Sequence, residues 1–227
     1  MNRRIHQRTY PGQIHTPSVE IESFENENLI LATIPWGSRD VSKTASRALR
    51  DFMSSTINDL EITSPFTKLP GLSPTANSIR IGTLVANDAI YQKFNKDHYT
   101  SACEILCLAF NNDELNWIQV GQPHLLLFRA GQFHTLSFSP DLSFDYELET
   151  PLPGRLLGVS NHIELESKSL KLKEGDKIVL ISRTTIPETI FSKKFSNLNS
   201  GEEILEKLFD FTAKAQTEKA FVIAVIE

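Results

Sequence analysis

The chain has 227 residues, 40% of them hydrophobic and 22% charged, a composition typical of a globular protein with a sizeable core. Its formal net charge of −5 favours neither nucleic acid nor an anionic membrane as a partner. The sequence contains no run of about 18 apolar residues, and its basic N-terminus lacks the apolar segment of a signal peptide, so we expect a cytoplasmic protein.

The first part of the chain predicts two strands. Residues 1–18 are polar and include two prolines, so we expect a tail or an edge segment there. Apolar and acidic residues alternate at 19–22, which predicts a strand with one solvated face. The apolar run 29–34 predicts a more buried strand, which should end at Pro35 because proline cannot donate to the hydrogen-bond ladder of a sheet.

Two helices are predicted next. Between residues 41 and 60, apolar residues recur at steps of three and four, which predicts a helix with one buried stripe. Ser73 followed by Pro74 is typical of an N-cap and a first helical turn. This second helix should extend to about residue 94.

The rest of the chain predicts antiparallel strands and one further helix. Turn residues separate the apolar runs, and Ser200 with Glu203 has the spacing of a helix capping box. Alternation at 163–166 slips in phase before Leu170, which predicts a β-bulge. The predicted strands are 102–110, 115–120, 125–129, 133–138, 163–172, 178–181 and 220–226.

This order of elements indicates an α+β protein and not an alternating βαβ protein. No linker rich in glycine, serine or proline divides the chain, so we expect a single domain over residues 19–227. The two cysteines, Cys103 and Cys107, lie in one apolar stretch, and we expect two buried thiols in a reducing compartment.

Four stretches carry motifs that occur in the same order in a known family. They are LILATIPWG with TASRAL, NWIQVGQPHLLLFRAGQFHTLS, RLLGVSNHIELESKSLKLKEGDKIVLIS, and the terminal EKAFVIAVIE. Their order resembles that of the metal-dependent protein phosphatase (PPM, type 2C Ser/Thr phosphatase) superfamily. The shared features are a strand before a helix, a glycine corner before a strand ending in arginine, a Gly-Asp turn before a strand ending in serine, and a closing strand. The resemblance covers residues 29–226.

The resemblance implies an α-β-β-α sandwich of two antiparallel sheets flanked by helices. In this family, aspartates at strand ends hold two Mg²⁺ or Mn²⁺ ions and a bridging water that attacks the phosphate, because hard cations need oxygen ligands. Carried over residue by residue, the family's ligand positions and one adjoining glycine fall at Trp36, Gly37, Gln122, Arg183 and Lys219. The family's N-terminal Arg-x-x-Asn-Glu-Asp pattern is not visible.

These replacements predict that no metal is bound and that no catalytic residue remains. A like charge about 4 Å from a dication costs roughly 8 kcal/mol at an effective dielectric near 20, so Arg183 and a bound metal exclude one another. One interpretation of Arg183 is a surface or salt-bridged arginine, paired with Glu218, Glu188 or Asp40. A second is that Arg183 and Lys219, with His124 nearby, replace the charge of the metals and bind a phosphate or a carboxylate.

Two further site residues have a plain structural interpretation. Trp36 could pack against its neighbours or serve as an anchor for a partner, and packing is the preferred reading. His124 follows a proline at a corner, where a satisfied loop histidine is the preferred reading. No other histidine, cysteine or carboxylate has the spacing of a metal or catalytic motif.

Three functions are consistent with this sequence. The first is a pseudophosphatase that regulates or scaffolds a protein partner, such as a phosphoprotein or a kinase in a bacterial-type signalling system. The second is an active metal-dependent Ser/Thr phosphatase in which Asp40, Asp176 or Glu218 rebuild a metal site. The third is a structural or assembly subunit whose former cleft is filled. We prefer the first hypothesis, in which the chain is not an enzyme and needs no cofactor.

Overall fold

The computed structural model describes the chain as two compact units. Unit 1 contains Val19–Gly121 and Arg155–Leu172, and unit 2 contains Asn2–Ser18, Gln122–Gly154 and Lys173–Glu227. Among the described residues, no helix is long and apolar enough to cross a membrane. The residues described are 3–14, 16–58, 66–139, 142, 152–182, 186, 188–215 and 218–227, with the side chains of 57 and 58 left out.

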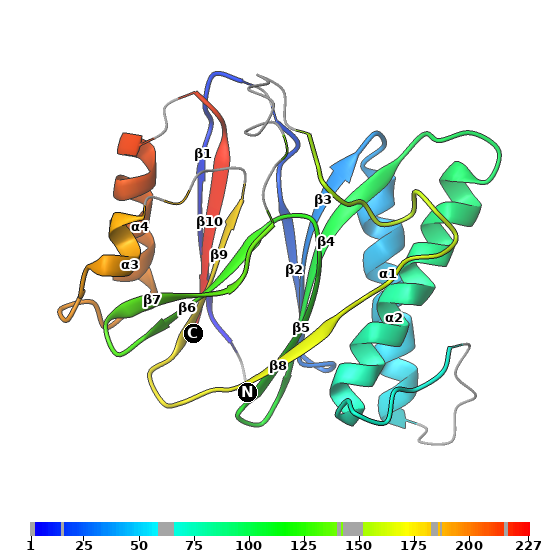
Figure 1. Ribbon diagram of the computed structural model, residues 1–227, viewed down its shortest axis with the longest axis horizontal. Helices are drawn as coiled ribbons and strands as arrows, with labels where there is room; N and C mark the ends of the chain where they lie inside the picture. The colour runs from blue at the N-terminus through cyan, green and yellow to red at the C-terminus, as the bar shows by residue number, and fades with distance from the viewer. Residues whose placement is uncertain are drawn as a thin grey trace. The chain divides into compact units, whose positions relative to one another are not determined.

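Unit 1 is a five-stranded antiparallel sheet with two helices along one face (Figure 1). The strands follow the order β2-β3-β4-β5-β8, so neighbours in the sheet are nearly neighbours in sequence. Its elements are β2 (Glu20–Phe24), β3 (Leu29–Trp36), α1 (Asp40–Asn58), α2 (Pro74–Ile90), the π-helix η1 (Tyr91–Asn95), β4 (Ala102–Asn111), β5 (Glu114–Val120) and β8 (Ser167–Lys171).

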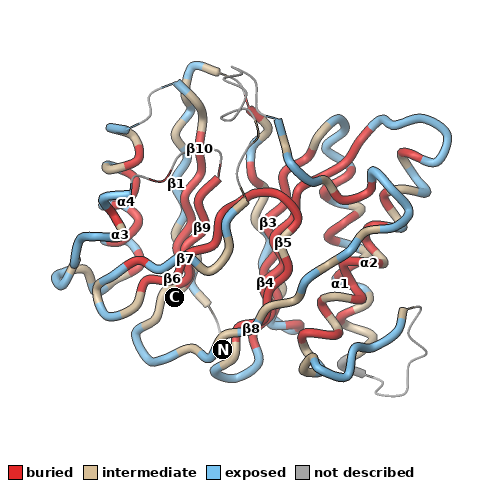
Figure 2. Tube along the Cα trace, in the orientation of Figure 1, coloured by how far each residue is buried: buried red, intermediate tan, exposed pale blue. Residues whose placement is uncertain are grey.

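The core of unit 1 lies between this sheet and α1 and α2. Successive side chains of a strand point to opposite faces, and Cys103, Ile105 and Cys107 of β4 all belong to the cluster that includes buried residues of both helices. Figure 2 shows β3, β4 and β5 buried along most of their length. Both cysteines are free and buried, as predicted, and burial raises the pKa of both thiols, which keeps them protonated.

Unit 2 is a second five-stranded antiparallel sheet, in the order β1-β10-β9-β6-β7, with α3 and α4 on one face (Figure 1). Part of the N-terminal segment expected as a tail or an edge forms β1, an edge strand paired with β10. The elements of this unit are β1 (Ile5–Tyr10), β6 (His124–Arg129), β7 (Gln132–Ser137), β9 (Lys177–Ser182), α3 (Thr189–Ser192), α4 (Gly201–Ala215) and β10 (Phe221–Ile226). The expected fold class, α+β with two antiparallel sheets flanked by helices, is confirmed.

The local capping signals are also confirmed. Oγ of Ser73 accepts a hydrogen bond of 3.2 Å from the N–H of Ala76, which starts α2 as predicted. Oγ of Ser200 accepts a bond from the N–H of Glu203, and the Glu203 carboxylate accepts one in return from the N–H of Ser200, each 3.2 Å long. This reciprocal pair is the capping box predicted for the last helix.

The prediction that Pro35 ends its strand is wrong, because β3 continues through Pro35 to Trp36. Pro35 lies opposite Cys103 of β4, whose N–H and C=O both bond to Leu157 on the other side of β4. Cys103 therefore requires no hydrogen bond from Pro35. On its other side β3 pairs with β2 only from Glu20 onward, so the missing N–H of Pro35 faces no ladder partner.

The strand predicted over 163–172 is confirmed only from Ser167 to Lys171, and the predicted bulge is wrong. Residues 162–166 carry no strand, and β8 begins only at Ser167, pairing with β5 in an unbroken register. Ile163 and Leu165 nevertheless pack against the core of unit 1. The alternation that predicted a strand is therefore satisfied by packing, without a ladder.

Candidate functional site

The first predicted position lies where β3 ends in unit 1. Nε1 of Trp36, a half-buried side chain, donates a 2.9 Å hydrogen bond to Oε2 of Glu104. Gly37 follows with a φ of +88°, and a Cβ on it would lie 2.3 Å from the carbonyl oxygen of Thr100. Glycine is required there by both conformation and space. The indole bond favours packing over a partner-binding role for Trp36.

Glu104 is a residue near this position that the sequence analysis did not single out. It lies in β4 opposite Ile34 and is 1% exposed. A Cβ on Gly121, at the end of β5, would lie 2.6 Å from Oε1 of Glu104, so the absence of a side chain lets this corner approach the carboxylate. One signal was available, since Glu104 is the single charged residue in the apolar run 102–110.

Gln122 and His124 form a buried polar cluster in unit 2, just before and at the start of β6. Their exposed fractions are 1% and 2%. Nε2 of Gln122 donates a 2.6 Å hydrogen bond to the carbonyl oxygen of Ser139, and the N–H of Ser139 donates a 3.1 Å bond to Nδ1 of His124. The structure therefore brings these two predicted residues together, through the backbone of Ser139 and through a direct contact of 3.4 Å between Nε2 of Gln122 and Nε2 of His124.

The His124 ring is held in one orientation by a stacked ring and a backbone hydrogen bond. It stacks on Phe138 with the ring centroids 4.2 Å apart and the planes 4° from parallel. Nδ1 accepts from the backbone N–H of Ser139, so the main chain fixes the direction of the ring. Both features are typical of a satisfied structural histidine.

Lys219 lies close to the N-terminal segment of unit 2. The carbonyl oxygen of Glu218 accepts hydrogen bonds from the N–H groups of Gln13 and Ile14, at 2.6 and 2.9 Å, and Ile14 forms an isolated parallel bridge with Lys219. Lys219 is half-buried. Arg183, the residue after the last position of β9, lies outside the described residues.

The carboxylates that could have rebuilt a metal site are engaged or scattered. Asp176 binds Arg129 through two hydrogen bonds, Asp40 pairs with Lys43 on the surface of α1, and Glu218 is exposed. Within the described ranges no group of three or more histidine, cysteine, aspartate or glutamate side chains could hold a metal ion.

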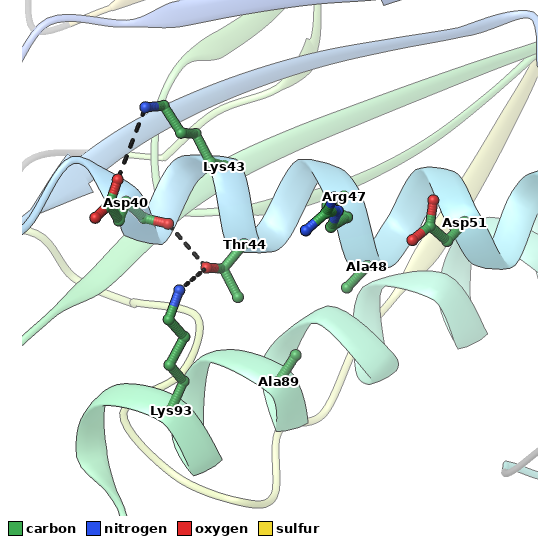
Figure 3. A pocket seen from close by; sticks show the side chains of 8 residues that line it. All are labelled: Asp40, Lys43, Thr44, Arg47, Ala48, Asp51, Ala89 and Lys93. Atoms are coloured by element: carbon green, nitrogen blue, oxygen red, sulfur yellow. Dashed lines mark hydrogen bonds and ion pairs between the residues drawn. The ribbon is translucent and has the colours of Figure 1, made fainter.

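A hollow of about 580 Å³ lies between α1 and α2 of unit 1 (Figure 3). None of the predicted site residues lines it, and it contains no cysteine or histidine. Its lining residues are Asp40, Lys43, Thr44, Arg47, Ala48, Asp51, Ala89 and Lys93. This hollow is a separate feature from the strand-end positions described above.

No protein-family model and no curated protein sequence matches the chain. Solved structures do match it over nearly its whole length. PppA, a key regulatory component of T6SS in Pseudomonas aeruginosa, superposes with a TM-score of 0.67 at 14% identity, covering 100% of this chain and 98% of PppA.

Two further structures give the same result. The PPM Ser-Thr phosphatase MsPP from Mycobacterium smegmatis, in complex with cacodylate, has a TM-score of 0.68 at 13% identity, covering 99% of this chain and 97% of MsPP. The catalytic domain of the serine threonine protein phosphatase PstP, in complex with two manganese ions, has a TM-score of 0.61 at 15% identity, with 99% and 97% covered. The chain therefore has the fold of the PPM Ser/Thr phosphatases.

Proposed function

We propose that the chain is a pseudophosphatase, a PPM-type fold that regulates or scaffolds a protein partner without metal-dependent catalysis. The observation that carries the proposal is the chemistry of the side chains at the positions where the family has metal ligands. The resemblance assigns Trp36, Gln122, Arg183 and Lys219 to these positions, and none of these side chains has a carboxylate.

The described residues among these do not fit a divalent metal. Mn²⁺ and Mg²⁺ require oxygen ligands, and two adjacent dications require several carboxylates. Trp36 offers only an N–H, which it donates to Glu104. Gln122 offers one neutral oxygen, and its amide nitrogen is held by the carbonyl of Ser139. Lys219 carries a positive charge, so its replacement of an aspartate adds repulsion to the loss of a ligand.

A regulatory role is consistent with the similarity to PppA, which is itself a key regulatory component of T6SS. The expected partner is a protein, such as a phosphoprotein or a kinase. Two free, buried cysteines are consistent with a reducing compartment, and we infer that the chain acts in the cytoplasm.

Arg183 and Lys219 extend this proposal to phosphate binding. In the sequence, Arg183 follows β9 and Lys219 comes just before β10, and both strands are inner strands of the sheet in unit 2. The resemblance assigns both cations to positions where the family has an aspartate. Arginine binds phosphate with two parallel hydrogen bonds, and lysine adds a point charge. His124 has no part in this proposal, because its ring is buried and Nδ1 accepts a backbone bond.

The proposal is tested by assaying the purified chain for hydrolysis of p-nitrophenyl phosphate and of a phosphothreonine peptide in Mn²⁺, beside PstP as the active control. We expect no turnover above the buffer rate from the chain. Phosphopeptide binding is measured on the same sample, with Arg183→Ala and Lys219→Ala as variants. Mn²⁺-dependent turnover would refute the pseudophosphatase; unchanged binding by both variants would refute the phosphate site alone.

A further inference from the structure

The hollow between α1 and α2 has a floor of short side chains. Thr44 and Ala48 lie four residues apart on α1 and therefore on one stripe of that helix, and Ala89 of α2 lies across from them (Figure 3). A methyl group offers little bulk, so the helix surfaces leave a groove where larger side chains would fill the space. Two of the three floor residues are apolar.

The rim of this groove has its positive charges in the middle. Along α1 the charged lining residues follow the order Asp40, Lys43, Arg47 and Asp51, so the acids stand at the two ends. Lys93, from η1, faces α1 from the opposite wall (Figure 3). Cations therefore line the groove from both walls.

Of the three cations that line the groove, Arg47 and Lys93 have no ion pair with a described carboxylate. Lys93 donates to Oγ1 of Thr44 at 3.2 Å, and its ammonium lies 4.8 Å from the centroid of the Phe94 ring. Nζ of Lys43 lies 3.7 Å from Oδ1 of Asp40, and both side chains are exposed. Such a pair contributes little free energy, so Lys43 can leave Asp40 to bind an anion of a partner. The bond to Thr44 holds Lys93 across the groove, which lowers the entropic cost of binding an anion there.

We propose that this groove binds a short acidic segment of a partner protein, with a carboxylate between Arg47 and Lys93 and an apolar side chain on the alanine floor. A carboxylate alone would leave the floor exposed to water, and an apolar group alone would leave two cations unpaired. The proposal rests on the proposed function only in that the partner is a protein, and it assigns that partner a surface on unit 1.

Fluorescence anisotropy tests this proposal with a labelled short peptide of alternating leucine and glutamate. We expect binding by the wild-type chain, and a loss of affinity of at least about tenfold in both Arg47→Glu and Lys93→Glu, because each change replaces an attraction by a repulsion. Lys68→Glu is the matched control, since Lys68 is an exposed lysine of the same unit that does not line the groove. It should bind the peptide like the wild type.

Three outcomes would overturn the proposal. One is no binding of the acidic peptide by the wild type, and another is equal loss in the control and the groove variants. The third is displacement of the peptide by inorganic phosphate at equal concentration, which would make the groove a site for small anions. Peptide binding needs no phosphatase activity, so failure here leaves the pseudophosphatase intact, and turnover in the activity assay leaves this result intact.

Discussion

Replacing Asp176 by asparagine removes one charge of an ion pair that ties the turn before β9 to β6. Arg129 donates from Nε to Oδ1 at 2.8 Å and from a terminal nitrogen to Oδ2 at 2.5 Å, and the N–H of Lys173 donates to Oδ2 at 2.7 Å. The side chain of Asp176 is 3% exposed and that of Arg129 is 24% exposed. The change therefore leaves a mostly buried guanidinium without its counter-charge.

The expected cost lies between two limits. Removing one partner of a fully buried pair costs about 3–5 kcal/mol, and an exposed pair contributes at most about 1 kcal/mol. Water reaches part of Arg129, and the asparagine oxygen can still accept one bond, so we expect a loss of about 2 kcal/mol in the free energy of unfolding. For a chain of this size that corresponds to about 4–8 °C in Tm.

Urea denaturation followed by circular dichroism measures this loss. Tryptophan fluorescence is not suitable, because the two tryptophans, Trp36 and Trp117, both belong to unit 1 and would not report on unit 2. Asp113→Asn is the matched control, since Asp113 pairs with Lys171 while 58% exposed and should change stability by less than about 0.5 kcal/mol. A loss in Asp176→Asn no larger than in the control would refute the reasoning.

The same pair predicts a pH dependence. Burial alone raises the pKa of Asp176, but the hydrogen bonds from Arg129 and Lys173 outweigh it, so the net pKa of this carboxyl is lowered in the folded state. Because the pKa is lower in the folded state, the ionised carboxylate stabilises the fold at pH values above the unfolded-state pKa of about 3.9. This contribution is lost as the pH falls through the folded-state pKa. The difference between the wild type and Asp176→Asn should therefore shrink below about pH 4.

Three further changes test other parts of the structure. Ser200→Ala removes the side-chain cap of α4 and should cost about 1 kcal/mol in thermal unfolding; no change in Tm would count against the capping box. Gly37→Ala should cost more than about 2 kcal/mol, because it requires a left-handed alanine and a clash with Thr100, and a fully stable variant would contradict the geometry. Glu227→Gln should lose about 1 kcal/mol at pH 7, since hydrogen bonding from His6 is the largest cause of the lowered pKa of Glu227. That loss should vanish below about pH 4, and a loss that persists in acid would contradict this role.

Much of the fold could be predicted because its signals are local. The capping residues Ser73 and Ser200 act within three residues of themselves, and strand runs such as 178–181 are apolar throughout. The strand predicted over 163–172 begins only at Ser167 for a non-local reason, since its pairing depends on where β5 ends. The prediction that Pro35 ends its strand was wrong for the same kind of reason. A proline can occupy this place in β3 because the opposite residue, Cys103, makes its backbone hydrogen bonds to Leu157.

The sequence predicted which residues belong to the candidate site, but not which of them contact one another. Trp36 and Glu104 are separated by 68 residues, and their hydrogen bond depends on the register between β3 and β4, which the sequence does not reveal. A single glutamate in an apolar run has no periodicity to mark it. The hydrogen bonds that orient Gln122 and His124 likewise go to the backbone of Ser139, which carries no residue-type signal.

The proposed pseudophosphatase binds no metal at its strand-end positions. Calorimetric titration of the chain with Mn²⁺, with PstP titrated under the same conditions, tests this claim most directly. We expect no heat of binding from this chain at concentrations that saturate PstP. Stoichiometric binding of one or two Mn²⁺ ions would contradict the proposal, because it would require carboxylate ligands that Trp36, Gln122 and Lys219 do not supply.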